Sequence, residues 1–134
     1  MSKELTKIVG IDLGTTNSLV AYMDGLHPKV IANSQGRTLV PSVVNFGEEG
    51  ILVGDAAKAR MITHPQETVY SIKRLMGRGI SDIKDEVNFI PFRIAENRPG
   101  VVEVRVGQTA YTPPEISAFI LKELKKRAEE FFKT

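Results

Sequence analysis

The sequence predicts an α/β protein, because stretches with the pattern of strands alternate with stretches that have a helical period. Residues 7–53 contain short apolar runs separated by turn signals, which is typical of an antiparallel meander. Residues 54–90 have a helical period, and residues 91–134 return to strands and close with an amphipathic helix. The length of 134 residues fits a single domain with a modest core.

Five strands are expected in the first zone, at residues 7–13, 18–23, 29–32, 43–46 and 51–53. The first run is almost continuously apolar, which predicts a strand buried on both faces. Asp24 and Gly25 form a strong signal for the turn of a β-hairpin.

Three helices are expected in the second zone, at residues 55–62, 67–76 and 81–87. Asp55 can cap the first helix and Pro65 lies beyond its end. Gly77 is placed to terminate the second helix. Two further strands, at residues 92–95 and 101–106, are expected to follow.

The closing helix has the most complete start signal in the chain. Thr112 is a predicted N-cap, Pro113 takes the first helical position, and Glu115 completes a capping box. One apolar stripe along this helix is predicted to face the core: Ile116, Phe119, Ile120, Leu124, Ala128 and Phe131.

Composition narrows the possible partners. The formal charge of +2 is too small to indicate binding to nucleic acid or to a membrane surface. The absence of cysteine excludes disulfides and thiolate metal sites. No run approaches the roughly 18 apolar residues of a membrane span, and no signal peptide is recognisable, so a cytoplasmic location is expected.

The most informative stretch for function is residues 10–18, in which Asp12 lies within an apolar run and a polar turn follows. Burying a carboxylate is costly unless a partner compensates it, and a hydrated metal ion is one such partner. Gly14 permits close backbone approach, while Thr15, Thr16 and Asn17 supply hydrogen-bond donors. The pattern therefore favours a nucleotide phosphate site.

A simple hairpin turn, with Asp12 bonding to its own backbone, remains the alternative at this point. Other phosphate and catalytic motifs are absent: there is no G-x-G-x-x-G, no P-loop and no G-x-S-x-G elbow. His27 and His64 both precede prolines and do not have the spacing of metal ligands.

Residues 10–18 resemble the first phosphate loop of the heat shock protein 70 chaperone family, of the DnaK type. The resemblance continues in the same order along nearly the whole chain. It covers residues 24–25, 37–42, 45–46, 52–54, 65–66, 72–78, 91–92 and 113–118. The phosphate loop alone would be shared more loosely with actin and with sugar kinases.

The resemblance implies specific roles for several residues. Lys73, which by its pattern is a lysine near the end of a helix, matches the lysine that reaches the γ-phosphate and the attacking water. Asp12 matches the carboxylate that orients Mg²⁺ through bound water. Gly14, Thr15, Thr16 and Asn17 match contacts to the phosphates of ATP or ADP.

The resemblance also implies a fold and a cellular role. The fold would be the actin-like ATPase (ribonuclease-H-like) type, with a mixed sheet and a small α/β subdomain inserted at about residues 40–112. Family members are several times longer, so residues 1–134 are expected to form the N-terminal part of the nucleotide-binding domain. The full-length parent would be an ATPase chaperone that binds unfolded polypeptides and co-chaperones.

Two alternatives of other classes remain open from the sequence. One is a different actin-like ATPase or sugar kinase, and the other is a non-enzymatic protein-interaction module. The isolated chain is expected to be inactive, because it carries only one side of a phosphate clamp. It is also expected to self-associate through an uncovered sheet edge.

Overall fold

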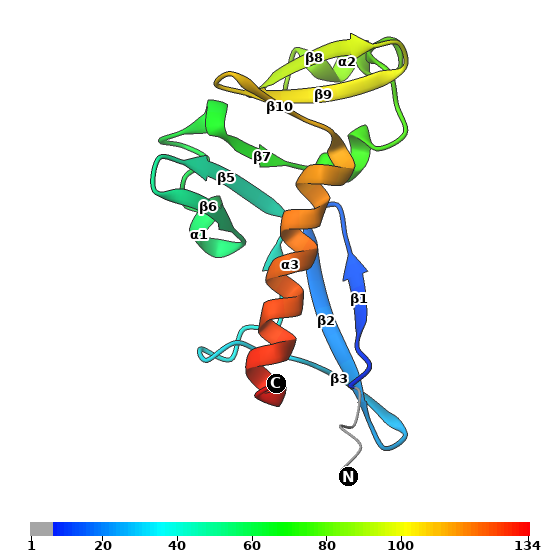
Figure 1. Cartoon of the computed structure of the whole chain (residues 1–134), viewed down its shortest axis with the longest axis vertical. Coiled ribbons are helices and arrows are strands. Elements are labelled where there is room, and N and C mark those ends of the chain that lie inside the picture. The colour runs from blue at the N-terminus through cyan, green and yellow to red at the C-terminus, as the bar shows by residue number, and fades with distance from the viewer. Residues whose placement is uncertain (1–6) are drawn as a thin grey trace.

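The computed structural model describes residues 7–134 and contains three antiparallel sheets arranged along one long helix (Figure 1). The helix, α3 (Pro113–Phe132), spans most of the length of the molecule and contacts strands of all three sheets. Every strand pair is antiparallel, so the parallel pairing that a mixed sheet requires does not occur within residues 7–134.

The first sheet is built around β2 (Asn17–Asp24), as predicted for the meander. On one side β2 pairs with β1 (Gly10–Leu13), and on the other side with β3 (His27–Val30) and the short β4 (Val40–Pro41). The predicted hairpin at Asp24 and Gly25 is confirmed, since Asp24 pairs with His27 and Gly25 has a φ of 63°.

The sequence predicted that the first strand is buried on both faces, and this prediction is wrong. Gly10, Ile11 and Asp12 are exposed, and only Leu13 is partly buried. Within residues 7–134, β1 pairs with β2 alone, so no strand covers its other edge. Its apolar composition is therefore not matched by burial in this part of the chain.

The second sheet has the order β6-β5-β7 and lies beside the middle of the molecule in Figure 1. Its strands are β5 (Val43–Gly47), β6 (Gly50–Val53) and β7 (Thr68–Tyr70). The helix expected at 55–62 is shorter than predicted: α1 (Asp55–Lys58) ends after one turn. Its N-cap is Gly54, with a φ of 85°, and not Asp55.

The prediction of a single helix over residues 67–76 is also wrong. A short 3₁₀ turn, η1 (Pro65–Glu67), leads into β7, which pairs with β5. After Ser71, which has a left-handed φ of 54°, the chain forms the 3₁₀ helix η2 (Ile72–Leu75). The buried pairing of β7 with β5 overrides the helical pattern, since local propensity yields to tertiary contacts.

The third sheet has the order β10-β9-β8 and lies at the end of the molecule near the start of α3 (Figure 1). Its strands are β8 (Arg93–Arg98), β9 (Val101–Val106) and β10 (Thr109–Tyr111), of which β10 was not predicted. The helix expected at 81–87 is divided between the 3₁₀ helix η3 (Ile80–Ile83) and α2 (Lys84–Val87).

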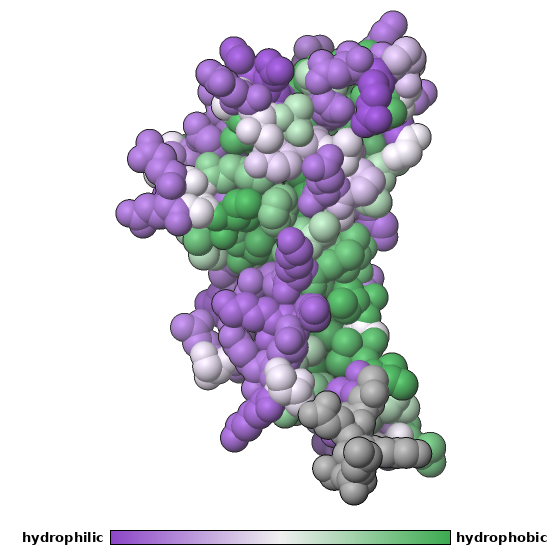
Figure 2. Space-filling model, in the orientation of Figure 1, coloured by the Kyte–Doolittle hydropathy of each residue, from purple (hydrophilic) through white to green (hydrophobic). Residues whose placement is uncertain are grey.

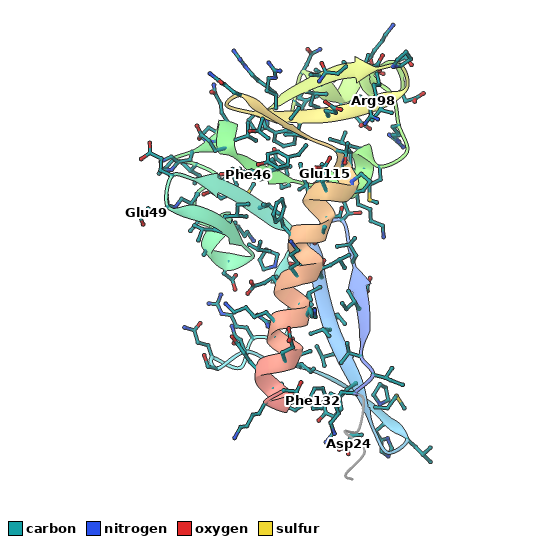
Figure 3. All side chains as sticks on the ribbon, viewed as in Figure 1. Asp24, Phe46, Glu49, Arg98, Glu115 and Phe132 are labelled. Atoms are coloured by element: carbon teal, nitrogen blue, oxygen red, sulfur yellow. The ribbon has the colours of Figure 1, made fainter. Side chains whose placement is uncertain are left out.

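Helix α3 begins as predicted. The backbone N–H of Glu115 donates to Thr112 Oγ1 at 3.3 Å, and Thr112 N–H donates to Glu115 Oε1 at 3.2 Å. Figure 3 places Glu115 near the start of the helix and Phe132 at its far end. Four members of the predicted stripe are buried: Ile116, Ile120, Leu124 and Ala128.

The end of the stripe differs from the expectation. Phe131 is 46% exposed, and its ring lies 5.2 Å from that of Tyr22 on β2. Phe132 is half-buried and packs edge-on against the same tyrosine at 5.4 Å. The outward face of α3 is charged, as the hydrophilic band over its lower half in Figure 2 shows. One face of the helix therefore packs on the first sheet, and the opposite face is exposed to solvent.

Candidate functional site

Residues 14–16 connect β1 to β2 in a tight reversal, and together with Asn17, the first residue of β2, they are called the β1–β2 loop. A Cβ atom added to Gly14 would lie 2.1 Å from the carbonyl oxygen of Asn17. No side chain can occupy that position without moving backbone, so the loop requires glycine for a steric reason. The sequence predicted the glycine from ligand approach, whereas the structure shows that the loop's own backbone also demands it.

Ser42, at the junction of β4 and β5, ties this loop to the rest of the molecule. Its backbone N–H donates to the carbonyl oxygen of Thr16 at 2.9 Å. Its hydroxyl donates to the carbonyl oxygen of Gly14 at 2.8 Å and lies 2.8 Å from the hydroxyl of Ser18. Ser42 is not among the predicted site residues, although a lone hydroxyl in the apolar run at residues 40–44 is a visible signal.

Lys73 reaches the same loop from a distant part of the sequence. It lies on η2, and its Nζ atom donates to the carbonyl oxygen of Leu13 at 3.0 Å. No carboxylate of residues 7–134 lies within ion-pair distance of this ammonium group. The structure thus brings together two predicted site segments that are 60 residues apart.

Asp12 is exposed on β1, next to Leu13. The cost of a buried carboxylate, from which the sequence argument started, therefore does not arise here, because solvent reaches the side chain. An exposed carboxylate oxygen remains a suitable partner for a hydrated Mg²⁺ ion, which keeps several of its waters. The residue fits the predicted role by its chemistry and position and not by burial.

The side chains of the loop are available to a ligand. Thr16 and Asn17 are exposed and Thr15 is partly buried. Within residues 7–134, no side-chain hydrogen bond engages any of the three. Two hydroxyls, one amide and a nearby ammonium group form a donor set that fits a phosphate group.

The loop is an open surface and not a deep pocket. Well-defined hollows lie elsewhere: one of about 570 Å³ borders the β5–β6 hairpin, and another of about 570 Å³ lies between β1 and α3. Within the described residues, no group of three or more His, Cys, Asp and Glu side chains could hold a metal ion. A metal at this loop would thus rely on water and on the phosphates for most of its ligands.

The β1–β2 loop therefore presents hydrogen-bond donors on an antiparallel sheet, with Lys73 beside it and α3 packed on the same sheet. A family model described as Hsp70 protein matches residues 8–134. The chain belongs to the Hsp70 family. Members of this family are chaperones that are generally ATPases, have an actin-like ATPase fold, and bind ATP or ADP with Mg²⁺. In residues 7–134, none of the helices combines the length and the apolar character that crossing a membrane requires.

Proposed function

We propose that this chain forms the first part of the nucleotide-binding domain of an ATP-dependent chaperone. In that protein, ATP hydrolysis would control the binding of unfolded polypeptide. The observation that carries the proposal is the 3.0 Å contact from Lys73 Nζ to the carbonyl oxygen of Leu13. This contact holds a cation beside a loop in which the side chains of Thr15, Thr16 and Asn17 make no hydrogen bond within residues 7–134.

Different residues in and beside the loop would bind the phosphates and the metal ion. Thr15, Thr16 and Asn17 donate hydrogen bonds to the phosphate oxygens, with Thr15 nearest the γ-phosphate. Asp12 accepts hydrogen bonds from the water shell of Mg²⁺ and so orients the ion. Bound Mg·ATP supplies the phosphoryl group and neutralises much of its charge.

Lys73 would act on the charge that develops during hydrolysis. A cation fixed before the reaction stabilises developing negative charge without the cost of rearranging water. The carbonyl of Leu13 holds the ammonium group at the base of the loop, and from there it would act on the terminal phosphate and on the attacking water. Lys73 and Asp12 are therefore the proposed catalytic pair, the latter acting through the metal ion.

The open loop supports the proposal that residues 1–134 are one side of a larger site. Residues 40–112 would form the inserted α/β subdomain, since β5 to β10 lie between β4 and α3 in the chain. Unfolded polypeptides and co-chaperones would bind through the full-length parent, in the cytoplasm. The match to the Hsp70 family model favours the chaperone over the two alternatives, a different actin-like ATPase or sugar kinase and a non-enzymatic protein-interaction module.

Lys73→Ala in the full-length protein tests the proposal. Single-turnover hydrolysis of ATP should fall by at least about a hundredfold, the scale seen when a preorganised charge stabiliser is removed. Binding of ATP should survive, because the other loop contacts remain. Lys126→Ala, which removes an exposed lysine on α3, is the matched control and should leave the rate unchanged.

Two results would contradict the proposal. Hydrolysis by Lys73→Ala within a few-fold of wild type would return Lys73 to the role of a surface lysine. Titration of the wild-type protein with Mg·ATP, with and without an unfolded peptide, tests the wider function. Peptide affinity that does not respond to ATP would exclude the chaperone cycle.

A further inference from the structure

We propose that Ser42 is a positioning residue, which fixes the β1–β2 loop in the shape that phosphate binding requires. The inference rests on the proposed function, since it assigns Ser42 a role toward the same loop. Ser42 itself would touch neither the nucleotide nor the metal ion. Its effect would pass through the backbone of Gly14 and Thr16.

The donor and the acceptor in each hydrogen bond of the Ser42 hydroxyl can be assigned. A carbonyl oxygen can only accept, so the 2.8 Å contact to Gly14 uses the single hydroxyl proton of Ser42. The hydroxyl of Ser18, 2.8 Å away, must therefore donate to Ser42 Oγ. The result is a relay from Ser18 to Ser42 and on to the loop.

Ser42 holds the loop on both sides of Thr15. Its hydroxyl binds the carbonyl of the residue before Thr15, and its N–H binds the carbonyl of the residue after it, Thr16. The proposed γ-phosphate contact thus lies between two fixed points. Such support is what a binding group needs, because an error of about 1 Å in position can cost a hundredfold in rate.

The same bonds engage oxygen atoms that would otherwise repel a phosphate. Lys73 binds the carbonyl of Leu13, and Ser42 binds those of Gly14 and Thr16. Carbonyl oxygens are acceptors and carry partial negative charge, so a phosphate oxygen avoids them. Engaging three of them with protein donors leaves the loop's own donors as the groups that an anion meets.

Burial makes the hydroxyl difficult to replace. Ser18 is 1% exposed and Ser42 is 2% exposed, so bulk water does not reach the relay. Removing the Ser42 hydroxyl would leave the Gly14 carbonyl without that donor and Ser18 without its acceptor. The backbone bond to Thr16 would persist, so the loop should loosen and not unfold.

The experiment compares serine variants of the full-length protein. Ser42→Ala should lower the single-turnover rate of ATP hydrolysis by about tenfold or more, with a smaller change in ADP affinity. Ser42→Thr keeps the hydroxyl and should recover most of the rate. Ser18→Ala should have a smaller effect than Ser42→Ala, because Ser42 can still donate to Gly14.

Ser117→Ala is the matched control. Ser117 is 3% exposed, and its hydroxyl contacts the sulfur of Met76 and makes no hydrogen bond to the β1–β2 loop. A fall in rate with Ser117→Ala equal to that with Ser42→Ala would reduce the effect to general stability and overturn the proposal. Ser42→Cys, which keeps the volume and weakens the donor, serves if Ser42→Ala does not fold.

The remaining outcomes separate this inference from the function on which it rests. If wild type binds and hydrolyses ATP while Ser42→Ala or Ser42→Cys hydrolyses it at the wild-type rate, the positioning role is overturned and the proposed function stands. If wild type does not bind ATP, the proposed function fails, and the positioning role fails with it.

Discussion

The turns at the two ends of β2 are stabilised in different ways. At its start, the β1–β2 loop is tied to Ser42 and Lys73, which are distant in sequence. At its end, the turn that leads to β3 is stabilised by neighbours in sequence. There the Asp24 carboxylate lies 2.8 Å from Lys29 Nζ across the hairpin, and Leu26 is 90% exposed.

The glycines of the two turns show the same difference. A Cβ atom on Gly25 would meet nothing within 4 Å, and the residue is needed only for its positive φ of 63°. A Cβ atom on Gly14 would collide with backbone. One turn therefore depends on local conformation, and the other on close packing and long-range hydrogen bonds, as the proposed phosphate-binding role of that loop would require.

The largest difference is expected from the two glycine-to-alanine substitutions. Gly14→Ala should weaken nucleotide binding by the full-length protein by more than about a hundredfold, because the clash must displace the loop. Gly25→Ala should cost about 1 kcal/mol of unfolding free energy for the left-handed conformation and leave nucleotide affinity intact. Calorimetric titration and thermal unfolding measure the two effects, and equal nucleotide affinities would contradict the comparison.

A smaller effect is expected from Thr15→Ala within the same loop. ATP hydrolysis or the ATP-triggered conformational change should weaken more than nucleotide binding, since one γ-phosphate contact matters most as charge develops. Single-turnover rates and affinities for ATP and ADP provide the measurement. Equal losses of affinity for both nucleotides, with turnover intact, would show that Thr15 has no special relation to the γ-phosphate.

The smallest effect is expected from Asp24→Asn in the turn between β2 and β3. The hydrogen bond and the charge of Asp24 raise the pKa of Lys29 above its ordinary value of 10.5. A raised pKa in the folded state means that the contribution to stability is complete below 10.5 and is lost as pH rises through the higher value. Because the pair is exposed, this contribution is small and is screened by salt.

Unfolding of wild type and Asp24→Asn at neutral and strongly alkaline pH checks this prediction. The difference between the two proteins should be small near neutrality and should vanish above the raised pKa of Lys29. A difference that grows with pH would have the wrong sign. Nucleotide affinity should be unaffected, in contrast to Gly14→Ala in the β1–β2 loop.

Local patterns in the sequence were sufficient where neighbours decide the structure. The capping box of Thr112 and Glu115, the hairpin at Asp24 and Gly25, and the buried stripe from Ile116 to Ala128 were all predicted correctly. Caps, tight turns and amphipathic faces depend on residues within a few positions of one another. Their chemistry is therefore visible in the chain itself.

Tertiary contacts decided the rest. Residues 68–70 became a strand because β5 offered a partner, and Asp12 is exposed on a strand that pairs with β2 alone within residues 7–134. The pattern of residues named Gly14 as a site residue, and the family resemblance added Lys73. Only the fold placed Lys73 beside the loop and revealed the bond from Ser42 to Gly14, because hydrogen bonds across 28 and 60 positions depend on how distant segments pack.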